Sequence, residues 1–589
     1  MSAEKLITDH IDIWTSAVQA KSASGRGSSK KRELYGIKKL RELILELAVR
    51  GKLVPQDPND EPASVLLERI AAEKAQLVKE KKIKKSKPLP AISESEMIQE
   101  LPNSWDFVRV GDISLLENGD RSKNYPNKSV LVESGIPFVN AGHLVSSRIN
   151  EAEMTYITQE RFDLLRAGKF NDGDILFCLR GSLGKCAIVE SFGIGAIASS
   201  LVIVRPEKSV VPEYLLKFFE SPLSLLSIKK YDNGTAQPNL SASDLAKFVI
   251  PLPPLNEQHR IVAKVDELMA LCDQLEQQTE ASLDAHQVLV ETLLATLTNS
   301  QDATELMANW ARISEHFDTL FTTEQSIDQL KQTILQLAVM GKLVPQDPND
   351  EPAAKLLERI AEEKAQLVKE KKIKKQKALP LIAEDEKPFE LPNGWEWCRL
   401  DDICQGITSG STPPKSNFQE LPGIPYLKVY NIRNQLIDFE YNPQFIDIEC
   451  HSSKLARSVL YPGDVVMNIV GPPLGKIALI PDSYPEWNCN QAITFFRPIE
   501  PSLNRYIYTY LTAGTFLDSI ELIGTAGQDN ISVTKSRSIV LPTPPLEEQS
   551  RIVRKVNDLL EICEQLKQRL RDSQQTQLKL TDAIVEQAL

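Results

Sequence analysis

The 589-residue sequence lacks the features of a membrane, secreted or metal-dependent protein. No apolar run approaches the ~20 residues that a membrane-spanning helix needs. The polar opening MSAEKLITDHIDIW has no apolar centre of the kind found in signal peptides. The eight cysteines form no C-x-x-C pair and the six histidines are isolated, so neither a disulfide framework nor a metal site is predicted. These absences predict a cytoplasmic protein with buried, reduced thiols.

The sequence also lacks net positive charge. Its net charge of −12 argues against a protein that coats nucleic acid nonspecifically. A local DNA-binding groove is still compatible with this total, because charge acts over only ~10 Å. Residues 101–250 carry 16 basic and 17 acidic side chains. A basic surface must therefore be made by folding.

Complete catalytic motifs are missing as well. In RGSLGKC the first glycine, Gly181, stands too close to Lys185 for a P-loop, and GPPLGKI fails likewise. Both segments are predicted to be tight turns between strands. A methyltransferase needs a glycine-rich cofactor loop and an Asn-Pro-Pro-Phe motif, whereas NPQF at 442–445 has Gln444 in place of proline. The sequence therefore predicts a chain without catalysis of its own.

What the sequence does contain is a tandem duplication. Residues 51–85 return at 341–375 with three substitutions. Between the repeated blocks, 114–250 and 404–541 share only sparse landmarks, such as GTAQPNLS and GTAGQDNIS. A near-identical frame thus alternates with two divergent inserts. The inserts, rather than the frame, are therefore predicted to carry the recognition surface.

The frame is predicted to be helical. After PLPPLNEQHRIV and PTPPLEEQSRIV, apolar residues step by 4, 3, 4 and 3, which is typical of a coiled-coil seam. Each of these helices could run about 40 residues, or ~60 Å. Shorter helices are predicted at 34–50 and 325–340, each ending at a glycine cap. The second long helix has no partner after it, so residues 34–100 are predicted to pack with 541–589; two independent hairpins are the alternative.

The inserts are predicted to be compact, mainly β domains of about 150 residues. Runs such as DILFCL and DVVMNIV are broken by Gly, Asn and Pro, and helical pieces fit 209–221 and 505–512. The predicted fold class is α+β: two mixed, mainly β domains joined by two long antiparallel coiled-coil helical spacers, pseudo-two-fold and circularly permuted. The predicted boundaries are 1–100 for the N-terminal helical region, 101–250 for the first insert, 251–390 for the central helical region, 391–541 for the second insert and 542–589 for the C-terminal helix.

The doubled frame, the insert openings LPNSW and LPNGW, and the endings PPLNEQHRIV and PPLEEQSRIV resemble one family over nearly the whole chain. It is the specificity (HsdS) subunit of type I restriction–modification enzymes, and the paired GKLVPQDPNDEP blocks are similar to its EcoA-like (type IB) group. The resemblance implies that each insert is a target recognition domain, which reads one half of an asymmetric, split DNA target.

The resemblance also implies partners. The helices would set the unread spacer and dock two methyltransferase (HsdM) subunits for adenine-N6 methylation, and a motor-nuclease (HsdR) subunit would join them for restriction. This chain would hold no cofactor; S-adenosylmethionine, ATP and Mg are expected on the partner subunits. Two alternatives stay open: a coiled-coil adaptor without DNA readout, and a stand-alone DNA methyltransferase. The lysine runs 79–85 and 369–375 either grip phosphates or form solvated helix ends, and the second interpretation is favoured.

Candidate contacts with DNA are polar side chains in the loops of the inserts, because base edges are read best by Arg, Lys, Asn and Gln. A structural role is the alternative for each of them. The candidates are Arg121, Lys123, Asn124, Asn140, His143, Arg180, Gln237 and Asn239 in the first insert, and Ser409, Ser411, Lys415, Asn431, Arg433, Asn468, Gln528 and Asn530 in the second.

Overall fold

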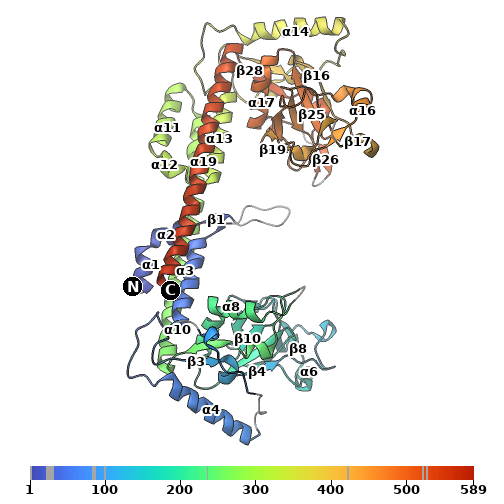
Figure 1. The fold of residues 1–589 in the computed structure, drawn as a ribbon. Helices are drawn as coiled ribbons and strands as arrows, with labels where there is room; N and C mark the ends of the chain where they lie inside the picture. Colours follow the sequence, from blue (N-terminus) through green and yellow to red (C-terminus); the bar gives the residue numbers. More distant parts are fainter. Residues whose placement is uncertain are drawn as a thin grey trace. The chain divides into compact units, whose positions relative to one another are not determined.

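The chain divides into two compact units, Met1–Ser282 with Ser573–Leu589, and Leu283–Asp572. Each unit combines a mainly β domain with helices (Figure 1). Over its described range the chain has no helix long and apolar enough to cross a membrane. The computed structural model describes residues 3–20, 32–81, 88–97, 101–234, 237–420, 423–520, 523–525 and 528–589.

The first domain is built on two four-stranded sheets. One is antiparallel with the order β11-β10-β13-β4, and the other has the order β8-β5-β12-β9 with β5 and β12 parallel. All four residues of β10 are buried. One face of β10 packs on the second sheet, and on the other face Phe177 contacts Phe219 of helix α7 (Pro212–Glu220), with ring centres 5.1 Å apart. The strands are β4 Ser114–Asn118, β10 Ile175–Cys178, β11 Cys186–Ile188, β13 Leu201–Pro206, β5 Ile136–Val139, β8 Thr155–Ile157, β9 Lys169–Asn171 and β12 Ile194–Ile197.

The second domain repeats this plan with different residues. Its sheets have the orders β16-β25-β22-β23 and β17-β21-β18-β24, and β18 and β24 are parallel. Helix α17 (Asn504–Ala513) packs on β22 and β23. Both helices predicted inside the inserts, α7 and α17, are therefore present. The strands are β16 Cys404–Ser409, β22 Val465–Asn468, β23 Ile477–Leu479, β25 Ile493–Pro498, β17 Phe418–Gln419, β18 Ile424–Leu427, β21 Phe445–Ile446 and β24 Asn488–Cys489.

The beginning and the end of each domain lie side by side. Strand β3 (Asp106–Arg109) pairs antiparallel with β14 (Val249–Leu252), and β15 (Glu396–Arg399) pairs with β28 (Val540–Thr543). An insert that opens and closes in one two-stranded ribbon can change its interior without changing the frame. This explains how such divergent inserts share one frame.

Two long helices and their shorter partners form the frame. Helix α10 (Leu255–Asn299) has 45 residues and α19 (Leu546–Ala588) has 43, which agrees with the predicted length. The predicted shorter helices are also present. They are α3 (Tyr35–Val49) and α13 (Glu324–Val339).

Each short helix ends at a glycine in the left-handed region, with φ of 68° at Gly51 and 69° at Gly341. A Cβ at Gly51 would come within 2.5 Å of the Pro102 side chain, so both backbone conformation and space favour glycine there. The predicted C-terminal caps are confirmed.

The two parts of α19 accompany different short helices. In the second unit Arg571 pairs with Glu324 of α13 at 2.8 Å. In the first unit Tyr35 Oη of α3 donates to Asp582 Oδ1 at 2.7 Å. Residues 573–589 thus belong with the N-terminal segment, and 542–572 belong with the second unit. The remaining helices of the frame are α1 Ala3–Asp9, α2 Ile11–Ser16, α4 Ala63–Lys79, α11 Ala303–Glu315, α12 Phe317–Leu320 and α14 Ala353–Lys369.

Candidate DNA interface

A turn that carries the repeated Gly-Lys pair connects two neighbouring strands of the antiparallel sheet in each domain. This Gly-Lys turn spans 179–185 between β10 and β11, and 469–476 between β22 and β23. Cys178 N donates to Lys185 O at 2.7 Å, and the amide before the second turn donates to Lys476 O at 3.0 Å. Because a phosphate-binding loop opens a helix whereas these segments join two strands, the prediction of tight turns is confirmed.

A second loop lies against the Gly-Lys turn in both domains. We call it the closing loop; it spans 232–240 and 528–531. The last residue of each closing loop donates its backbone N–H to the first residue of the Gly-Lys turn, at 2.9 Å in both domains. Two sequence landmarks that are far apart in the chain therefore form one surface. Of the Gly-Thr-Ala landmark, residues 235–236 and 526–527 lie outside the described residues.

Within the first domain this contact brings two predicted residues together. Arg180 Nε donates to Asn239 Oδ1 at 3.0 Å. The Asp232 carboxylate accepts the backbone N–H groups of Asn239 and Gly234 at 2.9 Å each, and these bonds lower the pKa of Asp232. The aspartate is therefore an anion that shapes the loop, while Arg180 and Gln237 stay exposed.

A β-hairpin packs beside the Gly-Lys turn. Its two tip residues have φ between 48° and 62° in both domains, which is the left-handed pair of a tight hairpin turn. In the second domain the tip is tied to the strand after the turn, because Ile477 N donates to Gln435 Oε1 at 2.6 Å. In the first domain Ile188 N donates to Ser147 O at 3.3 Å. The hairpin strands are β6 Leu144–Val145, β7 Arg148–Ile149, β19 Ile432–Arg433 and β20 Leu436–Ile437.

The second hairpin and its Gly-Lys turn border a concavity of about 360 Å³. Arg433, Asn434, Gln435 and Lys476 line it together with one isoleucine. The Arg433 guanidinium lies 4.2 Å from the centre of the Tyr441 ring and remains exposed. Two cations and two amides around one hollow offer contacts to phosphates and to base edges.

Three predicted residues are buried and hold loops in place. His143 and Asn431 stand at equivalent positions before the hairpins. His143 Nδ1 accepts from Asn140 N at 3.2 Å, and burial lowers the pKa of this imidazole. Asn431 donates to two backbone carbonyls at 2.9 and 3.3 Å. Asn468 likewise donates to two carbonyls and accepts from Lys476 N at 2.6 Å. The structure uses these three side chains for backbone positioning.

The opening loops, 119–128 and 410–417, carry further candidates. Asn124 Nδ2 donates to Leu164 O at 3.1 Å, and Ser411 Oγ accepts from Arg457 at 2.7 Å. Both polar groups therefore already have a partner inside the domain. The other candidates here comprise three exposed cations and one half-buried hydroxyl at the end of β16: Arg121, Lys123, Lys415 and Ser409.

Sequence reasoning missed several cations that the fold places beside the predicted residues. Lys185 is exposed and Lys476 half-buried at equivalent positions of the two Gly-Lys turns, and Arg148 is exposed at the first hairpin. The signal available was the Gly-Lys pair itself, repeated inside otherwise divergent inserts. Three candidates remain. The Asn140 side chain accepts from Gly142 N at 2.7 Å. On the second closing loop Asn530 is half-buried, and Gln528 is described by its backbone only.

Both domains match one family model, described as the type I restriction modification DNA specificity domain, over residues 102–285 and 392–573. The fold and its loops thus define a chain with two DNA specificity domains.

Two relatives cover it completely. The EcoAI specificity subunit of Escherichia coli is 45% identical over 610 residues, and the EcoEI specificity subunit of Escherichia coli is 46% identical over 615, each covering 100% of both chains. A chain in a solved structure of a type I R-M system aligns at 20% identity with a TM-score of 0.49, covering 83% of this chain and 99% of that one.

The chain belongs to the type I restriction enzyme specificity subunits, in the group that includes EcoAI and EcoEI. It is a DNA recognition subunit and not an enzyme in its own right. The predicted family and fold class are confirmed, and the two alternatives, a bare adaptor and a stand-alone methyltransferase, are set aside.

Proposed function

We propose that each domain reads one half of an asymmetric, bipartite DNA target, and that the helical frame fixes the length of the unread spacer. One observation supports this most strongly. In both domains the Gly-Lys turn, the closing loop and the hairpin occupy equivalent places in the fold, yet most of their side chains differ. Where the first domain has Val145 and Arg180, the second has Arg433 and Val470. The same loop arrangement with different side chains suits the recognition of two different half-sites.

The loop chemistry supports contacts to both the DNA backbone and the bases. Lys185 and Lys476 at equivalent turns suit phosphate contacts, which position a protein without specifying sequence. Arg180, Gln237 and Arg433 are long, exposed donors that can reach base edges in the major groove. The buried side chains of His143, Asn431 and Asn468 bind backbone groups and hold the recognition loops in place.

The proposed partners are double-stranded DNA, two methyltransferase subunits and motor-nuclease subunits, in the cytoplasm. A duplicated frame offers two equivalent docking places, so one chain does the work of a symmetric dimer. Adenine-N6 methylation would take place on the methyltransferase subunits. S-adenosylmethionine, ATP and Mg belong to these partners.

The test is to co-express the chain with its methyltransferase in a methylation-free host and to sequence the DNA for N6-methyladenine. A single split, non-palindromic motif is expected. Exchanging residues 101–250 for another family member's domain should then change one half of the motif only. No methylation from a soluble complex, or an exchange that alters both halves, would contradict the proposal.

A further inference from the structure

The internal duplication allows the two copies of the frame to be compared position by position. In the long helices, residues 255–279 correspond to 546–570. All seven buried positions of the first segment carry the same residue in the second, but only two of its eleven exposed positions do. Packing within the chain has therefore kept the buried residues the same in the two copies. The exposed residues of these helices have diverged since the duplication.

The segment that contains α4 shows the opposite behaviour. Residues 52–81 correspond to 342–371. Of the twenty exposed residues in 52–81, seventeen are identical in the second copy. The three differences pair Ser64, Val65 and Ala72 with Ala354, Lys355 and Glu362. Bonds within the chain account for part of this identity, since Gln56 donates to Glu257 and Arg69 pairs with Glu61. Identity that extends over seventeen exposed positions is nevertheless what a surface contacted by the same partner in both halves would show.

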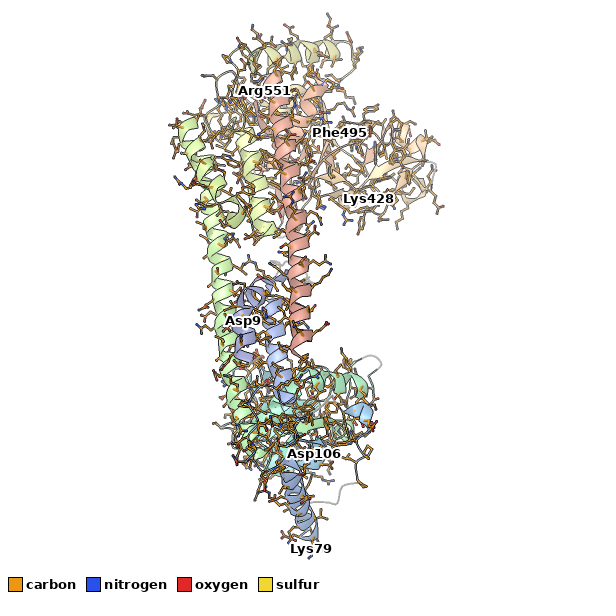
Figure 2. All side chains as sticks on the ribbon, turned by 60° about the vertical axis from the view of Figure 1, so that its left-hand side comes forward. Asp9, Lys79, Asp106, Lys428, Phe495 and Arg551 are labelled. Atoms are coloured by element: carbon orange, nitrogen blue, oxygen red, sulfur yellow. The ribbon has the colours of Figure 1, made fainter. Side chains whose placement is uncertain are left out.

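Helix α4 is attached by one face. Ala63, Leu66 and Ile70 are buried, and Lys74 Nζ donates to the carbonyls of Gly111 and Asp112 at 3.0 and 2.9 Å. Its C-terminal end at Lys79 points away from the β domain of its unit (Figure 2). In α14 the matching lysine, Lys364, donates to the carbonyl of Asp401.

Beside the attached face runs a stripe of exposed residues spaced by 4, 3 and 4, which places them on one side of the helix. The stripe is Arg69, Glu73, Gln76 and Glu80 in α4 and its cap, and Arg359, Glu363, Gln366 and Glu370 in α14 and its cap. We call these residues the frame stripe. Of the three differing positions, Val65 and Ala72 border this stripe, since Val65 stands four residues before Arg69 and Ala72 stands four before Gln76.

We infer that the frame stripe is a docking surface for a protein subunit that binds the chain in two copies. The inference rests on the proposed function, in which that subunit is the methyltransferase. The surface occurs twice with the same residues, so it fits two copies of one partner. Each stripe carries one cation and two carboxylates, and such a balance does not attract the phosphates of DNA.

The test uses the full chain with its methyltransferase and changes two exposed residues in each half. Glu73→Lys with Gln76→Lys alters the first stripe, and Glu363→Lys with Gln366→Lys alters the second. The matched control, Val65→Lys with Ala72→Glu, gives α4 the residues already present in α14. Circular dichroism checks that all variants keep their helices.

Native mass spectrometry should find two bound methyltransferase subunits for the unaltered chain and for the control. It should find one when either stripe is changed and none when both are, with affinity at each altered copy reduced more than about tenfold. Two bound subunits in every variant would overturn the inference. Tighter, more salt-dependent DNA binding by the lysine variants, with both subunits still bound, would also overturn it, because it would place DNA at the stripe. Split-motif methylation by the unaltered complex tests the proposed function separately.

Discussion

The indole N–H of Trp105 donates to Glu257 Oε2 at 3.0 Å, and Trp395 makes the same bond to Glu548, also at 3.0 Å. Each tryptophan opens a recognition domain, and each glutamate lies in the first turn of a long helix. A glutamine of the GKLVPQDPND loop donates to the other carboxylate oxygen, at 2.6 Å in the first half and 3.1 Å in the second. The joint between domain and helix is thus a buried carboxylate with donors on both oxygens, built alike in both halves.

Replacing Glu548 by Gln should destabilise the second joint. The amide keeps one acceptor where the carboxylate accepts from two donors, so one buried N–H loses its partner at a cost of about 1–3 kcal/mol. Urea unfolding followed by tryptophan fluorescence measures the change. The exposed neighbour provides the control: Glu547→Gln should shift stability by less than about 0.5 kcal/mol. An equal loss in both variants would argue against a special role for the joint.

The same pair of proteins should show a pH effect of defined sign. Burial raises the pKa of Glu548 above its ordinary value of 4.5, although the Gln346 and Trp395 donors oppose this. A carboxyl with a raised folded-state pKa stabilises fully below its unfolded pKa, and this contribution is lost as pH rises through the folded-state value. The stability advantage of the natural protein over Glu548→Gln should therefore shrink between pH 4.5 and neutrality. An advantage that grows with pH would contradict the raised pKa.

Arg399 should prove important for the chain segment that precedes the second domain. Its buried guanidinium binds Glu386 at 2.9 and 3.1 Å and the carbonyls of Pro380 and Ser538 at 3.0 and 2.8 Å. Arg399→Lys keeps the charge but loses the planar fork, so we expect about 1–3 kcal/mol of destabilisation. Limited proteolysis should then cleave residues 376–390 faster. Arg554→Lys, at an exposed position of α19, should leave the cleavage rate unchanged.

The cysteines should be unreactive in the folded protein. All eight are buried and free of disulfides, as the sequence predicts. Burial raises the pKa of Cys272 and of Cys563 to about 11, so almost no thiolate is present at pH 8. A chromogenic disulfide reagent should detect few thiols in the native chain and eight after denaturation. Rapid reaction of several native thiols would show that the buried positions open.

The frame could be predicted from sequence because helices have a period. The seam of Ile261, Val265 and Leu268 shows the period directly, and the glycines at 51 and 341 mark where the short helices end. The buried joint of Trp105 with Glu257 could not be predicted. A glutamate in the first turn of a helix is ordinarily a solvated residue that interacts with the helix dipole, and only the fold brings the distant tryptophan to it.

The candidate interface was predictable as loops but not as side chains. Asn431 and Asn468 were candidates because asparagine in a loop can read bases, yet both serve backbone groups that would otherwise lack partners in the domain interior. A loop has no period that tells which side chains point inward. The Gly-Lys turns were identified as turns, but nothing in RGSLGKC alone shows that the turn carrying Lys185 lies against the closing loop.

Lys185 and Lys476 should contribute phosphate contacts of equal kind in the two halves. The backbone carbonyl of each lysine accepts the hydrogen bond that closes its Gly-Lys turn. Because this bond does not involve the side chain, replacing the lysine by alanine should leave the turn intact. Loss of one phosphate contact lowers affinity for all sequences and reduces the slope of log affinity against log salt by about 1. Lys185→Ala and Lys476→Ala should therefore weaken binding without changing the methylated motif, and the double variant should reduce the slope by about 2.

An exposed lysine on a loop away from the turn, Lys208, provides the matched control, since Lys208→Ala removes the same charge elsewhere in the first domain. Its salt slope should equal that of the natural complex. Arg433→Ala tests the contrasting role, because a base-reading arginine should relax one position of one half-site at a cost of about 1–3 kcal/mol. Relaxed sequence preference in Lys185→Ala or Lys476→Ala would assign those lysines to base readout instead. An unchanged slope in both would remove the Gly-Lys turns from the DNA interface.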